Sequence, residues 1–361
     1  MDHLDLNSVF PGWRIVQSLG KGSFGETYEI ERMIQGLVET NVMKVIALPK
    51  DDSEIEALRQ QYDDESIAQF YDGIRQKMLK EYDFIRMFGS FPNIVHLIDA
   101  ATLRQENGLG WYVLIRMEPL TPLTRMDPIP INETRDQITL TKQVCRVGMD
   151  ICDALKFCEK RCLLHRNIKP ENIFVTDDGV YKLGDFGIAW ISERTASGAM
   201  VGTYQYMAPE VFDRTPKYNH RADLYSLGLT LYWLLNERTL PFLPHAGMTR
   251  VVPTADEVEA AVDRRLNPRN GERLPDPANG SRSLKDIVLK VCAYDPEDRY
   301  QSAEEMRREL EAEFKKYSGP LPSPYPPPYP PEDPTPRLRR YWYVAAAALA
   351  LIGAACWFFL R

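Results

Sequence analysis

The 361-residue chain has few of the residues that build metal centres and disulfide frameworks, namely six cysteines and five histidines. No two cysteines form a C-x-x-C pair, and no histidine lies at zinc-ligand spacing from a cysteine. A structural zinc site is therefore not expected. The cysteines are best explained as free thiols in a reducing compartment.

Positive charge is also in deficit, because 44 lysines and arginines face 51 aspartates and glutamates, a net charge of −7. Within residues 1–317 the counts are 40 and 49, which argues against a general nucleic-acid-binding surface. The opening residues Met1–Asn7 include two aspartates and lack the basic and apolar pattern of a signal peptide. We therefore expect most of the chain to be cytoplasmic, with an ordinary globular composition.

The densest group of polar residues lies in L-L-H-R-N-I-K-P-E-N-I-F-V at Leu163–Val175, and G-D-F-G-I-A follows at Gly184–Ala189. Packing alone does not explain a histidine, two cations and two amides on one turn. The order and spacing resemble the catalytic loop and metal-binding turn of eukaryotic-type (Hanks-type) serine/threonine protein kinases, H-R-D-L-x-x-x-N and then D-F-G. The departure is Asn167, which stands where that family has its catalytic aspartate.

Earlier landmarks of the same family occur in the expected order. G-K-G-S-F-G contains Gly20, Gly22 and Gly25, and glycines let backbone N–H groups approach phosphate oxygens. The strand predicted over 41–46 places Lys44 where the family has the lysine that pairs with the α and β phosphates of ATP.

A charged segment over 51–86 has apolar residues at spacings of three and four, which predicts one or two helices. The resemblance assigns a glutamate of this segment to Lys44. Glu81 is the preferred residue and Glu65 is the alternative. After a predicted strand pair, the resemblance places the adenine-binding hinge at Met117, Glu118, Pro119 and Leu120.

The resemblance implies a metal and phosphate site after the hinge. Asn172 and Asp185 would hold Mg²⁺, with Mn²⁺ as the alternative, and Lys169 would approach the γ-phosphate. Asp223 would brace the catalytic loop from below, and Arg299 would pair with Glu210. Lys169 together with Thr203 is typical of the serine/threonine subclass.

Arg166 suggests regulation, because an arginine beside the catalytic position can pair with a phosphorylated residue of the activation segment. Thr195 and Ser197 are the nearest candidates, with Thr203 as a further one. Plain loop polarity is the alternative explanation for these hydroxyls.

The expected architecture is an α+β, bilobal protein-kinase-like domain over residues 1–317. A small β-rich N-lobe would span about 13–117 and a larger helical C-lobe about 118–317. In the C-lobe, a helix from about Thr139 would carry an apolar stripe to the catalytic loop. Capping boxes at Thr254–Glu257 and Ser302–Glu305 predict two later helices.

The remaining residues have a different composition. Residues 319–336 are more than half proline, so 318–340 is expected to be a stiff linker, with an adaptor-binding tract as the alternative. Residues 341–360 are uncharged and flanked by aromatic clusters, which predicts one transmembrane helix. Three arginines precede this run, so the kinase-like region is expected to stay cytoplasmic on a C-terminal anchor, without an external sensor domain.

Asn167 divides the functional interpretation. An amide accepts a hydrogen bond from a substrate hydroxyl but does not take its proton. The lost general base is typically worth ~10² to 10⁴ in rate, or about 3 to 5 kcal/mol of barrier. The first hypothesis is a weakly active, membrane-anchored kinase that binds ATP and acts on a protein substrate or on itself. The second is a pseudokinase that serves a signalling partner as a nucleotide-binding switch, and the third is an engineered inactivation of an ordinary kinase.

Overall fold

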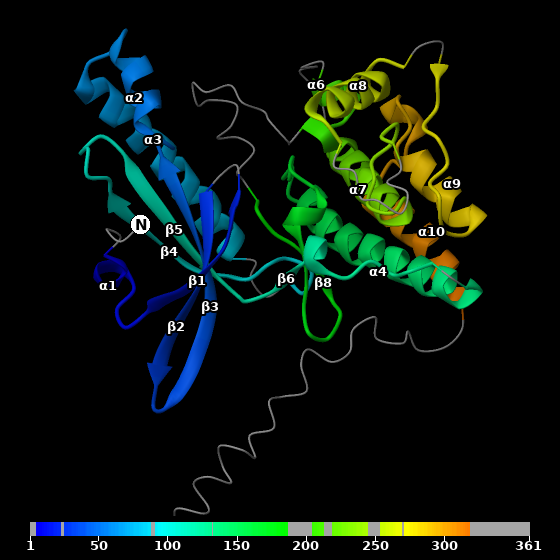
Figure 1. Cartoon of the computed structure of the whole chain (residues 1–361), viewed down its shortest axis with the longest axis horizontal. Helices are drawn as coiled ribbons and strands as arrows, with labels where there is room; N and C mark the ends of the chain where they lie inside the picture. Colours follow the sequence, from blue (N-terminus) through cyan, green and yellow to red (C-terminus); the bar gives the residue numbers. More distant parts are fainter. Residues whose placement is uncertain are drawn as a thin grey trace, which may run out of the picture. The chain divides into compact units, whose positions relative to one another are not determined.

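The computed structural model describes residues 5–22, 25–87, 91–131, 133–186, 204–212, 219–244, 253–268 and 271–317. The chain divides into two units, Met1–Pro320 and Leu321–Arg361, and every described residue belongs to the first. A β-rich N-terminal lobe is joined to a mostly helical C-terminal lobe (Figure 1). This arrangement confirms the bilobal α+β prediction. The predicted linker 318–340 and membrane helix 341–360 lie outside the described residues.

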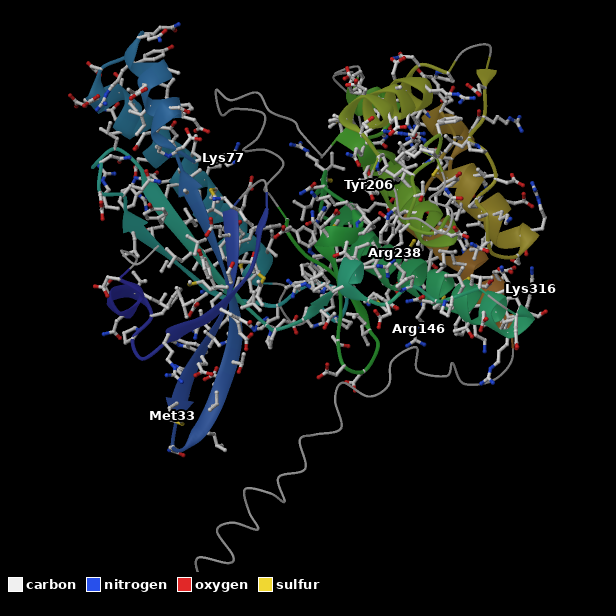
Figure 2. The ribbon with its side chains drawn as sticks, in the orientation of Figure 1. Met33, Lys77, Arg146, Tyr206, Arg238 and Lys316 are labelled. Carbon is white, nitrogen blue, oxygen red and sulfur yellow. The ribbon has the colours of Figure 1, made fainter. Side chains whose placement is uncertain are left out.

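The N-lobe is an antiparallel five-stranded sheet in the order β1-β2-β3-β5-β4. Its strands are β1 (Arg14–Gly22), β2 (Gly25–Ile34), β3 (Leu37–Leu48), β4 (Leu97–Arg104) and β5 (Trp111–Met117). The β2–β3 hairpin extends beyond its neighbours and carries Met33, which is 66% exposed, near its tip (Figure 2). A short helix, α1 (Leu6–Val9), precedes the sheet and packs on it through Leu6 and Phe10.

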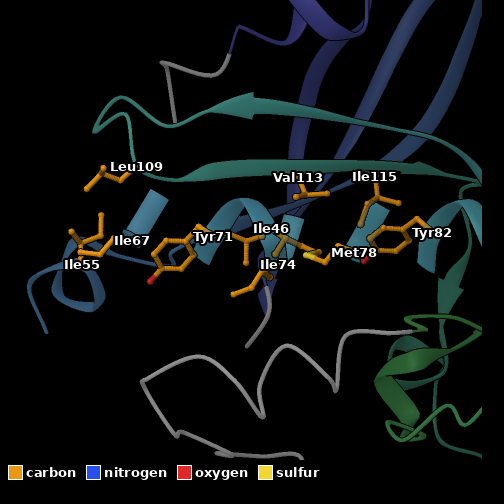
Figure 3. Close-up of a cluster of buried hydrophobic side chains, with 11 residues drawn as sticks. Ile46, Ile55, Ile67, Tyr71, Ile74, Met78, Tyr82, Leu109, Val113 and Ile115 are labelled. Atoms are coloured by element: carbon orange, nitrogen blue, oxygen red, sulfur yellow. The ribbon is translucent and has the colours of Figure 1, made fainter. Parts of the chain in front are cut away.

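Two helices, α2 (Asp52–Arg59) and α3 (Asp64–Arg86), lie on the other side of this sheet. Asp63 caps α3 by accepting a hydrogen bond from Ser66 N at 2.8 Å. The apolar residues predicted to share one face are all buried against β3 and β5, as Figure 3 shows: Ile67, Tyr71, Ile74, Met78, Tyr82 and Ile85. The helical spacing therefore predicted the packed face of α3 correctly.

The C-lobe begins with a small sheet of β6 (Thr121–Pro122), β7 (Ile173–Val175) and β8 (Tyr181–Leu183). Its helices are α4 (Thr134–Glu159), α6 (Pro209–Phe212), α7 (His220–Leu235), α8 (Ala255–Leu266), α9 (Arg282–Val291) and α10 (Ala303–Lys315). The short 3₁₀ turns are η1 (Leu123–Arg125), η2 (Pro170–Asn172), η3 (Tyr204–Tyr206) and η5 (Pro296–Asp298). Helix α4 begins five residues before the predicted start, because Glu133 and Asp136 form a capping box there.

Candidate active site

The catalytic loop is held from below by Asp223 in the first turn of α7. Its carboxylate accepts hydrogen bonds from the backbone N–H groups of His165 and Arg166, each at 2.8 Å. The two N–H groups converge because Arg166 has a left-handed backbone, with φ of 64°. Burial raises the pKa of Asp223, while His165 and these hydrogen bonds act in the opposite direction. The predicted brace is confirmed.

His165 connects this loop to the D-F-G turn. Its Nε2 is 2.8 Å from the carbonyl oxygen of Gly184, and its ring packs edge-on against Phe186 with 4.4 Å between centroids. Burial lowers the pKa of His165. This neutral histidine therefore joins the residues before Asn167 to the residues around Asp185.

Asn167 and Asn172 lie in the same loop and are connected through the backbone of Asn167. The Asn172 side chain donates Nδ2–H to the carbonyl oxygen of Asn167 at 2.7 Å, and Asn167 N–H donates to Nδ1 of His165 at 3.3 Å. Donation through Nδ2 leaves the Asn172 side-chain oxygen as its remaining acceptor. Lys169 is partly exposed on the same loop, and Arg166 is exposed.

Lys44 and Asp185 meet across the two lobes. Lys44 projects from β3 and its Nζ lies 2.6 Å from Oδ2 of Asp185, which follows β8. The side chains are only 10% and 20% exposed. The structure therefore brings together the ammonium predicted for phosphate and the carboxylate predicted for metal.

Glu81 does not form the predicted pair with Lys44. Among the described residues, Lys44 pairs with Asp185, and no ion pair joins it to Glu81. Tyr82, the next residue of α3, lines a cavity of about 20 Å³ together with Lys44. The rotation of α3 therefore presents Tyr82 to the lysine, and it turns Glu81 elsewhere.

Glu81 instead lines a groove of about 430 Å³ between α3 and the catalytic loop, with Lys77, Lys80 and Arg166. Burial raises the pKa of Glu81, and the nearby charges of Lys77 and Arg166 act against that rise. The alternative, Glu65, is exposed and accepts a hydrogen bond from Gln69, so the structure does not bring it to Lys44 either.

The three glycines of the glycine-rich segment differ in their surroundings. Gly22 pairs with Gly25 across the hairpin, whose tip residues 23–24 lie outside the described residues. A Cβ on Gly20 would meet no atom within 4 Å, whereas one on Gly25 would lie 2.1 Å from the carbonyl oxygen of Val45. Gly25 is therefore required for the close approach of β2 to β3.

The predicted hinge follows β5. Met117 ends β5 and lines the small cavity beside Lys44. The Glu118 carboxylate accepts hydrogen bonds from His96 N and from Lys182 Nζ, both at 2.7 Å, so it links the two lobes. Leu120 is partly buried. Ile115 was missed from the sequence, although it pairs directly with Lys44 in the β3–β5 register and lines the same cavity.

The activation segment is described only at its end. Thr195, Ser197 and Thr203 lie outside the described residues. Farther on, Arg299 makes the predicted pair with Glu210, with nitrogen–oxygen distances of 2.7 and 2.9 Å. The prediction of this buried pair is confirmed.

A second buried arginine, Arg265 of α8, was not predicted. It donates to the carbonyl oxygens of Tyr204, Gln205 and Met207 at 2.7 to 3.1 Å, and to the Tyr225 hydroxyl at 2.8 Å. No short motif contains it, because its partners lie 40 to 61 residues away in the sequence. Arg265 thus fixes the end of the activation segment to α8.

The donor set fits a magnesium nucleotide. Asp185 and Asn172 offer oxygen ligands, which Mg²⁺ prefers, and Lys44 offers a compact positive charge to phosphate. In the described part of the chain, no group of three or more His, Cys, Asp or Glu side chains is placed to hold a metal. Two protein oxygens suit an ion whose other ligands are phosphate oxygens and water.

Comparison with known proteins agrees with this geometry. Residues 13–310 match the protein kinase domain. A probable serine/threonine-protein kinase of Clostridium perfringens is 30% identical over 227 residues, 62% of this chain and 30% of that protein. The serine/threonine-protein kinase PknB of Mycobacterium tuberculosis is 34% identical over 227 residues, 61% of this chain and 33% of PknB.

A probable serine/threonine-protein kinase of Dictyostelium discoideum, nek3, is 29% identical over 294 residues, which is 79% of this chain and 22% of nek3. The chain spans a third or less of the length of these relatives. The family match, however, covers most of this chain and includes both lobes. The chain therefore belongs to the protein kinase family, in its Hanks-type serine/threonine group.

Proposed function

We propose that the chain binds MgATP and slowly transfers the γ-phosphoryl group to serine or threonine hydroxyls of protein substrates, itself included. The observation that carries this proposal is the convergence of Lys44 and Asp185, 2.6 Å apart, beside the loop that holds Asn172. An ammonium, a carboxylate and an amide from three separate elements are what a magnesium triphosphate needs.

In this proposal Lys44 leaves Asp185 when nucleotide binds and pairs with the α and β phosphates. Asp185 and Asn172 then hold Mg²⁺, which neutralises the charge of the phosphates. Lys169, on the same loop, approaches the γ-phosphate. Met117, Glu118 and Leu120 border the adenine through their backbone.

Asn167 limits the rate. Its amide orients the acceptor hydroxyl but leaves the proton to solvent or to the phosphate. A loss of ~10² to 10⁴ from the usual turnover of roughly 1 to 100 per second leaves a slow reaction. Phosphorylation of the chain by itself tolerates such a rate better than turnover of a distant substrate.

The alternative function is a pseudokinase that binds nucleotide as a switch or scaffold. Two observations favour it: Asn167 occupies the catalytic position, and Glu81 does not pair with Lys44. Labelled phosphate transfer decides between the two functions, measured for the chain as given, for Asn167→Asp and for Lys44→Met. Activity of the unaltered chain that is lost in Lys44→Met supports the kinase, whereas activity only in Asn167→Asp supports the switch.

Regulation by phosphorylation is part of the proposal. Arg166 is exposed beside the catalytic loop, where a phosphate on Thr195, Ser197 or Thr203 would find a charge-assisted partner. Mass spectrometry after incubation with MgATP tests this step. A chain without added phosphate between Asp185 and Thr203 would rule it out.

Membrane anchoring is proposed from residues 341–360 alone. Among the residues that the structure describes, none of the helices is long and apolar enough to cross a membrane. Membrane fractionation of the full chain and of a version ending at Tyr317 would test the anchor. Equal recovery of both in the soluble fraction would contradict it.

A further inference from the structure

Asn167 combines deep burial with unused hydrogen-bonding capacity. Its side chain belongs to a residue that is 3% exposed, and within the described residues neither Nδ2 nor Oδ1 has a hydrogen-bond partner. Its neighbours His165 and Asn172, in contrast, each use a side-chain nitrogen in a hydrogen bond of 2.7 to 2.8 Å. The orphaned amide is therefore a local feature of position 167 within an otherwise bonded loop.

The loop leaves Asn167 little freedom to find a partner within the protein. Its backbone N–H is bonded to His165 and its carbonyl oxygen to Asn172, so the position of its Cα is fixed from both sides. Exchanging the amide oxygen and nitrogen would change nothing, since both atoms are unpartnered. A buried amide without partners is disfavoured, so the site is suited to a ligand that supplies them.

An amide and a carboxylate differ in what they offer such a ligand. An aspartate at this position would only accept hydrogen bonds, and it would add a negative charge close to Asp185. The amide is neutral and offers an N–H donor. The ligand that gains from this exchange is an anionic acceptor, and the proposed occupant of the cleft ends in one, the terminal phosphoryl group of ATP.

We propose that Asn167 binds this terminal phosphoryl group directly. Nδ2 donates a hydrogen bond to a phosphoryl oxygen, and Oδ1 accepts one from the acceptor hydroxyl or from water. The contact exists only with a triphosphate, so the asparagine makes the chain retain ATP in preference to ADP. This inference rests on the proposed binding of MgATP and adds a selectivity that the family's aspartate would oppose.

Isothermal titration calorimetry on the full chain in detergent micelles tests this selectivity. The probes are MgADP and the magnesium complex of the β,γ-imido analogue of ATP, which is not turned over during the titration. The variants are Asn167→Asp, Asn167→Ala and the control Asn7→Asp. Asn7 is exposed and its Oδ1 accepts a hydrogen bond from Gly12 N, which an aspartate can also accept. The control therefore adds the same charge away from the cleft.

Asn167→Asp should weaken the triphosphate analogue about tenfold, because a donor to a charged group is lost and a like charge is added. Asn167→Ala, which loses only the donor, should weaken it about threefold or more. MgADP should change by less than about twofold in every variant, and Asn7→Asp should match the unaltered chain. Equal changes for both nucleotides, or an alanine variant that binds the analogue as the unaltered chain does, would overturn the inference.

The outcomes separate this inference from the proposed function. An unaltered chain that binds neither nucleotide would contradict the proposed function itself. One that binds both, with a ratio of affinities unaffected by position 167, would contradict only the phosphoryl contact. If the buried charge of Asn167→Asp prevents folding, the alanine variant alone decides, because it places no charge in the loop.

Discussion

In the C-lobe, the polar residues of the site are fixed by hydrogen bonds to backbone atoms. Asp223 receives two N–H groups, His165 bonds to Gly184, and Arg265 donates to three carbonyl oxygens. In the N-lobe, Lys44 and Glu81 depend on side-chain contacts and on the rotation of one helix. The lobes therefore differ in how far local sequence determines the site, since a residue that bonds to the backbone within its own motif has little choice of partner.

The C-lobe frame should be the most sensitive to substitution, beginning with Asp223. Asp223→Ala leaves the buried N–H groups of His165 and Arg166 without an acceptor, which should cost about 2 to 6 kcal/mol of unfolding free energy. Asp223→Asn retains one acceptor and should lose about half as much. Denaturant unfolding of residues 1–320, followed by tryptophan fluorescence, measures both. Equal stabilities of the alanine variant and the unaltered domain would show that this brace is not needed.

Arg265 should have the next largest effect. Arg265→Met leaves three carbonyl oxygens and a tyrosine hydroxyl without their donor, which should cost about 2 to 4 kcal/mol. Arg264→Met is a matched control from the same helix, because Arg264 is exposed and pairs only with Glu272 among the described residues. The same unfolding measurement should find this control close to the unaltered domain. A control as damaging as Arg265→Met would assign the effect to α8 as a whole.

These two residues show what the sequence could and could not predict. Asp223 was predicted because it lies in a short motif, as were the apolar spacing of α3 and the Glu210–Arg299 pair. Arg265 was missed because its partners are backbone atoms distant in sequence, which carry no side-chain signal. Glu81 was placed on the correct helix, but its direction depends on packing between the lobes, which helical periodicity does not specify.

Asp150 extends the comparison to pH. It lies on α4, accepts a hydrogen bond from Tyr181 N at 2.9 Å, and is near Arg146, which Figure 2 labels. Burial raises the pKa of Asp150 to about 6 from 3.8. The folded state therefore binds the proton more tightly, and this stabilisation is complete below about pH 4 and lost as pH rises through about 6.

Asp150→Asn should remove this pH dependence, because the amide still accepts from Tyr181 and carries no charge. Between about pH 4 and pH 7 the unaltered domain should lose about 1 to 3 kcal/mol relative to the variant. Unfolding curves at several pH values compare the two. Parallel curves across this range would show that Asp150 keeps its ordinary pKa.

The smallest effect is expected in the N-lobe, at Glu81. Because Glu81 lies in the groove with Lys77 and Arg166, Glu81→Gln should change the affinity for MgADP by less than about threefold, whereas Lys44→Met should weaken it more than about tenfold. Calorimetry of both variants provides the comparison. A glutamine variant as weak as Lys44→Met would mean that nucleotide draws Glu81 to the lysine. The side-chain contacts of the N-lobe would then be remade on binding, while the backbone-bonded frame of the C-lobe remained in place.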